Sequence, residues 1–79
     1  MNDRATLAAF DRVTFEPAKM GGRACIRGLR ITVGQVIGLV AEGASYDEIL
    51  GDFPYLERAD IQQALEYAAW LASEEVFSA

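Results

Sequence analysis

Three arginines near the start of the chain have the side-chain chemistry best suited to recognising a partner. Arg23, Arg27 and Arg30 lie in a segment that reads as short strands and turns. An arginine presents a planar guanidinium that can pair with a carboxylate through two parallel hydrogen bonds. We therefore predict that these three residues bind a partner macromolecule. The alternative is that they pair, across a dimer, with the acidic helices of another copy.

The residues needed for catalysis are missing from the sequence. The chain has no histidine, so neither a serine nor Cys25 has the usual general base. Cys25 stands beside Ile26 in an apolar run, which is typical of a buried, inert thiol. One thiol without histidine cannot complete a tetrahedral zinc site. The Gly21–Arg23 run lacks the spacing of a phosphate-binding loop. We expect a binding protein that is not an enzyme and carries no cofactor and no metal.

A group of carboxylates between positions 47 and 60 is the remaining candidate for chemistry, because converging carboxylates can hold magnesium. The group comprises Asp47, Glu48, Asp52, Glu57 and Asp60. Four of these five fall at the starts of two predicted helices, where carboxylates suit the positive end of the helix dipole. We interpret them as helix-start residues and not as a catalytic site.

The pattern predicts a single domain, residues 1–79, that is mainly α: a β arm with turns over 1–31 and a three-helix bundle over 32–75. In the arm, the alternation of Val13 and Phe15 with polar neighbours predicts a first strand, Gly21-Gly22 predicts a turn, and the short apolar run Ala24–Ile26 predicts a second strand. A third short extended piece is predicted at Arg30-Ile31. The three-helix part has the order of a helix-turn-helix domain.

Helix-start and helix-stop residues set the expected bounds of the three helices. Thr32 is the predicted N-cap of the first, which Gly43 ends. Ser45 and Glu48 form a capping box for the second, and Pro54 ends it. The third is expected from Glu57 to Glu75.

The third helix also carries the predicted dimer interface. Beside its apolar stripe it has a second one, formed by Tyr67, Trp70 and Leu71, with Trp70 as the natural anchor. The chain is small, has one cysteine and is 52% hydrophobic, so self-association is the means of stabilisation that remains. We predict a homodimer. The alternative is that the β arm of the same chain covers this stripe.

Charge is divided unevenly along the chain, whose net charge is −5. Residues 1–31 hold six basic and three acidic residues, whereas residues 32–79 hold one basic and nine acidic residues. In a helix-turn-helix protein the helix after the turn reads bases through its first residues. The possible DNA contacts are therefore Arg58, Gln62 and Gln63 at the start of the third helix, together with Arg27 and Arg30 of the arm. Because phosphate contacts need more cations than this, we expect the chain alone to bind DNA weakly.

Several sequence blocks, spanning residues 12–70, resemble one known family. They are Gly21–Val33, Gly43–Leu50, Phe53–Leu56, Asp60–Leu65 and Tyr67–Ala69. Together they are similar to the small prokaryotic proteins of the domain of unknown function 433 family. The chain departs from the family pattern at Ala24, where proline is usual, and at Leu29, where threonine is usual.

The resemblance implies a helix-turn-helix-like domain with a β arm, commonly dimeric, that acts as the antitoxin of a type II toxin–antitoxin pair. The implied partner is a small PIN-like nuclease, whose active site gathers carboxylates around magnesium. The alternatives are a DNA-binding transcriptional regulator without a toxin partner and a structural dimerisation module. The toxin-inhibiting segment is the arginine arm or, as an alternative, the C-terminal tail 76–79. The first residues include Asp3 and Arg4 and no long apolar run, which predicts a cytoplasmic chain without a signal peptide or membrane segment.

Overall fold

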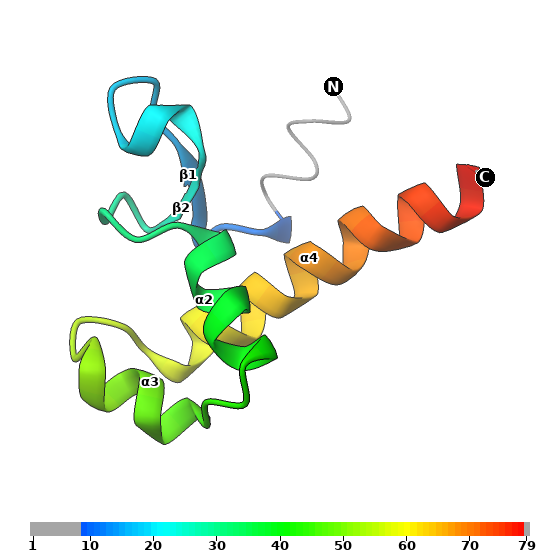
Figure 1. Ribbon diagram of the computed structural model, residues 1–79. Coiled ribbons are helices and arrows are strands. Elements are labelled where there is room, and N and C mark those ends of the chain that lie inside the picture. The colour runs from blue at the N-terminus through cyan, green and yellow to red at the C-terminus, as the bar shows by residue number, and fades with distance from the viewer. Residues whose placement is uncertain (1–8, 79) are drawn as a thin grey trace.

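Two short strands form a β hairpin near the start of the described part of the chain. In the computed structural model, which describes the backbone of residues 9–78 and the side chains of residues 9–73, β1 (Val13–Phe15) pairs antiparallel with β2 (Ala24–Ile26). Val13 lies opposite Ile26, and both are buried, whereas Phe15 remains 48% exposed. A single 3-10 turn, η1 (Met20–Gly22), joins the strands (Figure 1). Both strands and the turn between them agree with the sequence prediction.

The prediction of a third extended piece at Arg30-Ile31 is wrong. Residues 27–30 form a turn, and only an isolated bridge between Cys25 and Thr32 follows. The cause is the backbone of Arg27 (φ 45°) and Gly28 (φ 71°), which both adopt the left-handed conformation. The chain therefore reverses direction, and the N–H of Ile26 bonds to the carbonyl of Ile31 at 3.1 Å.

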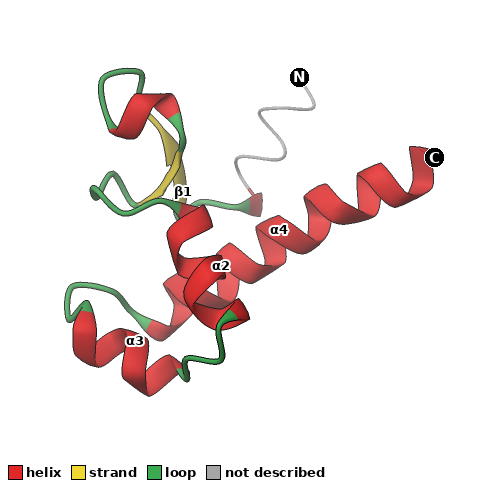
Figure 2. Ribbon diagram, in the orientation of Figure 1, coloured by secondary structure: helices red, strands yellow, loops and turns green. Residues whose placement is uncertain are grey.

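Three helices follow the hairpin: α2 (Val33–Ala41), α3 (Tyr46–Asp52) and α4 (Arg58–Ser78). Thr32 caps α2 and Ser45 caps α3, each through a reciprocal capping box with the residue three positions on. Gly43 (φ 98°) ends the first of these helices in the left-handed conformation. The mainly helical domain with an N-terminal β arm is thus confirmed (Figure 2). Helix α4 extends three residues beyond the predicted end at Glu75.

The core lies where the hairpin, α2, α3 and α4 meet. Its buried hydrophobic residues are Val13, Ile26, Ile31, Val33, Val36, Ile49, Leu56, Ile61 and Ala64. Helix α4 starts within this core, and its second half projects beyond α2 and α3 (Figure 1). Within residues 9–78, no helix combines the length and the apolar character needed to cross a membrane.

Candidate functional site

A buried carboxylate joins the β arm to the helices. Asp60, in the first turn of α4, is 0% exposed. One of its oxygens, Oδ1, accepts hydrogen bonds from Arg12 Nη1 at 2.8 Å and from Arg27 Nε at 2.9 Å. The other, Oδ2, accepts from Arg27 Nη2 at 2.9 Å and from the backbone N–H of Glu57 at 2.8 Å. We call this cluster of Asp60, Arg12 and Arg27 the Asp60 hub.

The charges of the Asp60 hub stabilise one another. Burial by itself raises the pKa of Asp60, but the hydrogen bonds from Arg27, Arg12 and the Glu57 backbone outweigh burial and hold that pKa below its ordinary value. Hydrogen bonds to Glu57 and Asp60 raise the pKa of Arg12, and the hydrogen bond to Asp60 raises that of Arg27. Every acceptor position of the buried carboxylate is filled, so the ion pairs keep their full charge at neutral pH.

Further hydrogen bonds extend the Asp60 hub on both sides. Arg27 Nη2 also donates to the carbonyl of Tyr55 at 2.9 Å, in the loop that precedes α4. The backbone N–H of Arg12 donates to Gln63 Oε1 at 2.6 Å, and Gln63 Nε2 donates to Asp11 Oδ1 at 3.1 Å. The start of α4 is therefore bonded to the residue before β1, to the residue after β2 and to the loop after α3. This fixes the orientation of the arm relative to the helices.

The three arginines predicted to bind a partner divide into two kinds. Arg27 is committed to the Asp60 hub. Arg23 and Arg30 are exposed, and neither forms an ion pair with any residue whose side chain the structure describes. Arg27 pairs with Asp60 of α4 within one chain, and so does Arg12, which the sequence interpretation had not included. Pairing of arm arginines with the helices of another copy stays a prediction.

The residues predicted to contact DNA at the start of α4 bind other parts of the same chain. Gln63 holds the arm, as described above. Gln62 accepts from the Tyr46 hydroxyl at 3.1 Å. Arg58 pairs with Asp47 at 2.8 Å and stands over the Tyr46 ring, 5.2 Å from its centroid. These contacts connect α3 to α4 and leave fewer side chains available for reading bases.

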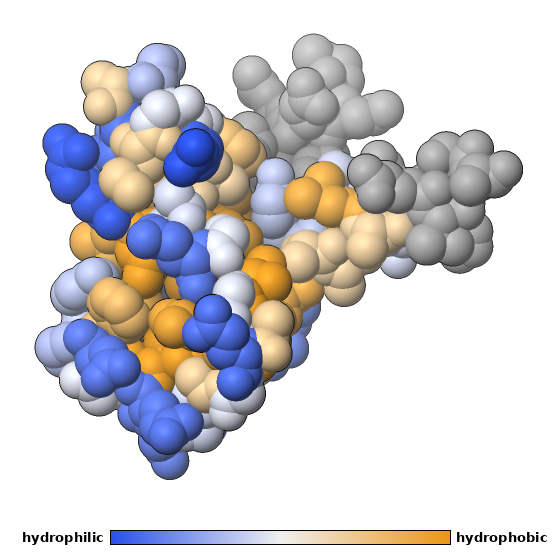
Figure 3. All heavy atoms as spheres, in the orientation of Figure 1, coloured by the Kyte–Doolittle hydropathy of each residue, from blue (hydrophilic) through white to orange (hydrophobic). Residues whose placement is uncertain are grey.

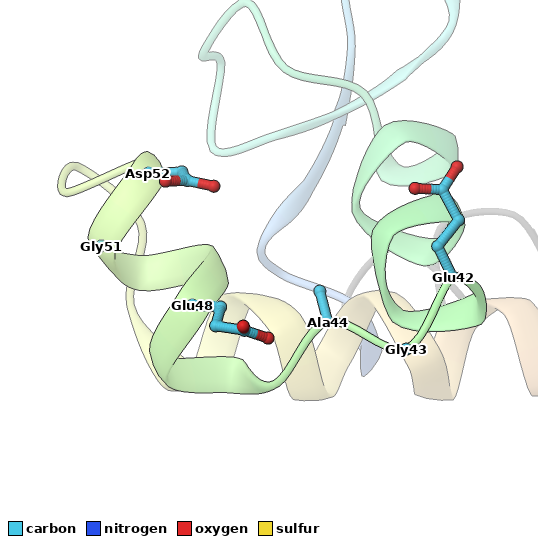
Figure 4. Close-up of a pocket in the computed structure, with 6 residues that line it drawn as sticks. All are labelled: Glu42, Gly43, Ala44, Glu48, Gly51 and Asp52. Atoms are coloured by element: carbon cyan, nitrogen blue, oxygen red, sulfur yellow. The ribbon is translucent and has the colours of Figure 1, made fainter.

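The five carboxylates considered above do not gather at one point, although Glu57 and Asp60 both accept from Arg12 Nη1 at 2.8 Å. Asp60 is in the hub, Asp47 pairs with Arg58, and Glu48 accepts from the backbone N–H of Ser45 at 2.8 Å. Glu48 and Asp52 line an open pocket of about 720 Å³ between α2 and α3, together with Glu42 (Figure 4). In the part of the chain that the structure describes, no three potential ligands are placed to hold a metal ion.

The stripe predicted as a dimer interface is partly covered by the arm. The Tyr67 ring packs against Phe10 and Phe15, with centroids 5.3 and 6.5 Å apart. Trp70 packs against Phe10 at 5.9 Å. Leu71 is 43% exposed. The alternative that the same chain covers the stripe therefore holds for Tyr67 and Trp70 but not for Leu71.

An apolar groove remains open beside this stripe. It has a volume of about 460 Å³ and lies between the hairpin, the start of α2 and the face of α4. Arg23 is its charged member, and the other lining residues are Phe15, Ala24, Thr32, Val33, Gly34, Ile37, Tyr67, Ala68 and Leu71. In the view of Figure 3, hydrophilic residues surround hydrophobic ones, and hydrophobic residues are visible between the hairpin and the helices.

The Asp60 hub is the feature that sequence reasoning missed. Asp60 was interpreted as a helix-start residue, and its backbone contact with Glu57 is indeed of that kind. A further signal was present, because Asp60 adjoins Ile61 and precedes Ala64 by four residues, which places it on the buried stripe of the helix. A carboxylate on a buried stripe requires a cationic partner, and every basic residue of the chain except Arg58 lies within residues 1–31.

The fold and the site define a small, mainly helical domain whose N-terminal β arm is held by a buried carboxylate. Residues 13–68 match the model of a family described as protein of unknown function (DUF433). The chain belongs to the DUF433 family. It is also similar to the crystal structure of a DUF433 member protein from Anabaena variabilis, with a TM-score of 0.73 and 26% identity, over 92% of this chain and 75% of that chain. No curated protein matches the chain.

Proposed function

We propose that this protein is a non-catalytic binding protein that acts as the antitoxin of a type II toxin–antitoxin pair, with a small PIN-like nuclease as its partner. The observation that supports this proposal is the division among the arginines. The Asp60 hub holds the arm rigidly, and Arg23 and Arg30 extend from it without carboxylate partners among the described side chains. Because the backbone of the arm is already held in place, binding costs less conformational entropy than if the whole arm had to become ordered.

The chemistry of inhibition follows from the charge of such a nuclease site. A pocket that gathers carboxylates around magnesium is strongly negative when the metal is absent. An arginine inserted there pairs with carboxylates through parallel hydrogen bonds and competes with the metal. Without the metal, the attacking water is not activated. Arg23 and Arg30 are the residues we assign to this role, and Arg27 is assigned to holding the arm in position.

The first test is whether a small nuclease-like reading frame lies beside this gene, and the second is co-expression of its product with this protein. We expect the two proteins to co-purify and the complex to cleave RNA slowly. The double variant Arg23→Ala/Arg30→Ala is expected to weaken the complex by at least about tenfold and to restore cleavage, because truncating charges that pair at an interface is costly. Arg58→Ala is the matched control, since Arg58 is also exposed but lies outside the arm and pairs with Asp47 of α3.

Two results would count against the antitoxin proposal. If no nuclease co-purifies, the proposed partner is wrong. If the double variant neutralises the nuclease as well as the unchanged protein does, the arm is not the inhibitory segment. The C-terminal tail 76–79 would then be the segment to truncate, and it lies outside the residues whose side chains the structure describes.

A DNA-binding regulator is the second candidate, because α2 and α3 are joined by a short turn and followed by α4, in helix-turn-helix order (Figure 2). We expect the chain alone to bind DNA no more tightly than about 10⁻⁶ M at physiological salt, the range of non-specific binding. The net charge of −5 opposes the phosphate backbone. A salt titration of binding to operator DNA checks this, and tight sequence-specific binding would favour the regulator over the antitoxin.

A further inference from the structure

The apolar groove has the size and the lining of a small-molecule site. Its volume of about 460 Å³ lies within the range of roughly 300–1,000 Å³ that such sites occupy. Its ten lining residues are fewer than half of the roughly 20–30 that one side of a standard protein interface uses. Phe15 and Leu71 border it and are 48% and 43% exposed, so the groove opens to solvent. The size therefore favours a small ligand over a whole protein surface.

Three elements form the walls of the groove. The hairpin contributes Ala24, α2 contributes Gly34 and α4 contributes Ala68, and each of these small residues is accompanied by larger apolar ones. Thr32 is a neutral polar member, and its hydroxyl is already hydrogen-bonded to Gln35. The walls consequently offer few hydrogen bonds, so the part of a ligand that lies between them must be apolar.

Gly34 keeps space in the groove although the fold does not require glycine at this position. It lies in the first turn of α2, and an added Cβ would meet nothing closer than Thr32 Oγ1 at 3.9 Å. That distance is an ordinary van der Waals contact, and glycine weakens a helix relative to alanine. A larger side chain would therefore be compatible with the folded chain and would occupy part of the groove that Gly34 lines.

Arg23 determines the chemistry of the ligand's head group. It is the one charged residue among the described residues that line the groove, it stands directly before β2, and it forms no ion pair with any described side chain. A guanidinium binds a carboxylate through two parallel hydrogen bonds. We propose that the groove binds a fatty acid with one unbranched chain of about ten carbons, whose chain lies along the apolar walls and whose carboxylate pairs with Arg23.

Isothermal titration calorimetry of the full chain with decanoate tests the ligand class. We expect a Kd of about 0.1 mM, because a ligand of about twelve non-hydrogen atoms in an open groove binds weakly. Decyltrimethylammonium has the same chain with a cationic head, and it is expected to bind at least about tenfold more weakly. Acetate, which has the head without the chain, should show no binding. Arg23→Glu should reverse the preference between the two amphiphiles.

Two pairs of variants locate the ligand. Gly34→Leu is expected to raise the decanoate Kd at least about tenfold, whereas Gly51→Leu, the same change at an exposed position of α3 outside the groove, should leave it unchanged. Arg23→Gln is expected to raise the Kd about fivefold. Its control is Arg58→Gln, the same change at an exposed arginine outside the groove, which should have no effect. Circular dichroism checks that each variant keeps its helices.

Three results would overturn the proposal. Equal affinity for decanoate and decyltrimethylammonium would show that Arg23 does not select the head group. Unchanged binding of decanoate by Gly34→Leu would place the ligand outside the groove. If the amide resonances of groove residues shift when the protein is diluted but not when decanoate is added, a second copy of the chain occupies the groove instead. No nuclease takes part in these measurements, so this inference and the antitoxin proposal can fail separately.

Discussion

Replacing Asp60 with alanine is expected to lower the free energy of unfolding by about 3 kcal/mol. The reason is that the side chain is fully buried and accepts hydrogen bonds from Arg12, Arg27 and the backbone of Glu57. Removing it leaves two guanidinium groups without their common partner. The expected loss is at the lower end for a broken buried pair, because both arginines are partly exposed to water. Urea denaturation at pH 7 measures it.

A surface ion pair in the same protein provides the control. Asp47 pairs with Arg58 at the same distance of 2.8 Å, but its side chain is 88% exposed. Asp47→Ala is therefore expected to change the free energy of unfolding by no more than about 0.5 kcal/mol. If Asp60→Ala and Asp47→Ala lower the free energy of unfolding equally, burial of Asp60 does not increase its contribution to stability.

Acidification should remove the same stabilisation that Asp60→Ala removes. The pKa of Asp60 in the folded protein lies below its ordinary value of 3.8. The stabilisation is consequently complete above that ordinary value and is lost as the pH falls through the folded pKa. The difference between the unchanged protein and Asp60→Ala should stay constant from pH 7 to about pH 4 and shrink below it. A difference that shrinks already near pH 6 would contradict the assignment.

Ile26→Ala is the second change with a large expected effect. Ile26 is 0% exposed and lies at the end of β2, opposite Val13 and directly before Arg27. Removing three carbons from a fully buried site is expected to lower the free energy of unfolding by about 3 kcal/mol, and Ile26→Val by about 1 kcal/mol. Thermal and urea unfolding measure both. If the two variants unfold alike, Ile26 does not contribute through packing.

Both changes act on the attachment of the arm, Ile26 through the core and Asp60 through ion pairs. A domain of this size has a total stability of roughly 4–12 kcal/mol, so either loss is a large fraction of it.

Measuring both stability and partner binding for arginine variants separates structural arginines from binding arginines. Arg27→Ala should reduce stability as well as any binding, whereas Arg23→Ala and Arg30→Ala should reduce binding alone. The three arginines can therefore be assigned to structure or to recognition by measuring both quantities for each.

The sequence by itself determined the local elements of this protein. Val13 and Phe15 alternate with polar neighbours, Ala24–Ile26 is a short apolar run after a glycine turn, and Thr32 and Ser45 carry capping partners three residues on. Such features depend on neighbours within a few residues, and the chain order alone supplies those. The family followed from the same local blocks, since residues 13–68 match it. The third strand failed because the left-handed backbone at Arg27 is uncommon for any residue but glycine.

Only the tertiary structure decided what each charged residue does. Arg27 and Arg30 look alike in the sequence, yet Arg27 meets Asp60 across 33 positions and Arg30 is exposed to solvent. Arg12 drew no attention in the sequence and became a member of the Asp60 hub. The reason is physical. A buried carboxylate must be paired, and the cation that pairs with it is chosen by the folded path of the chain and not by nearness in sequence.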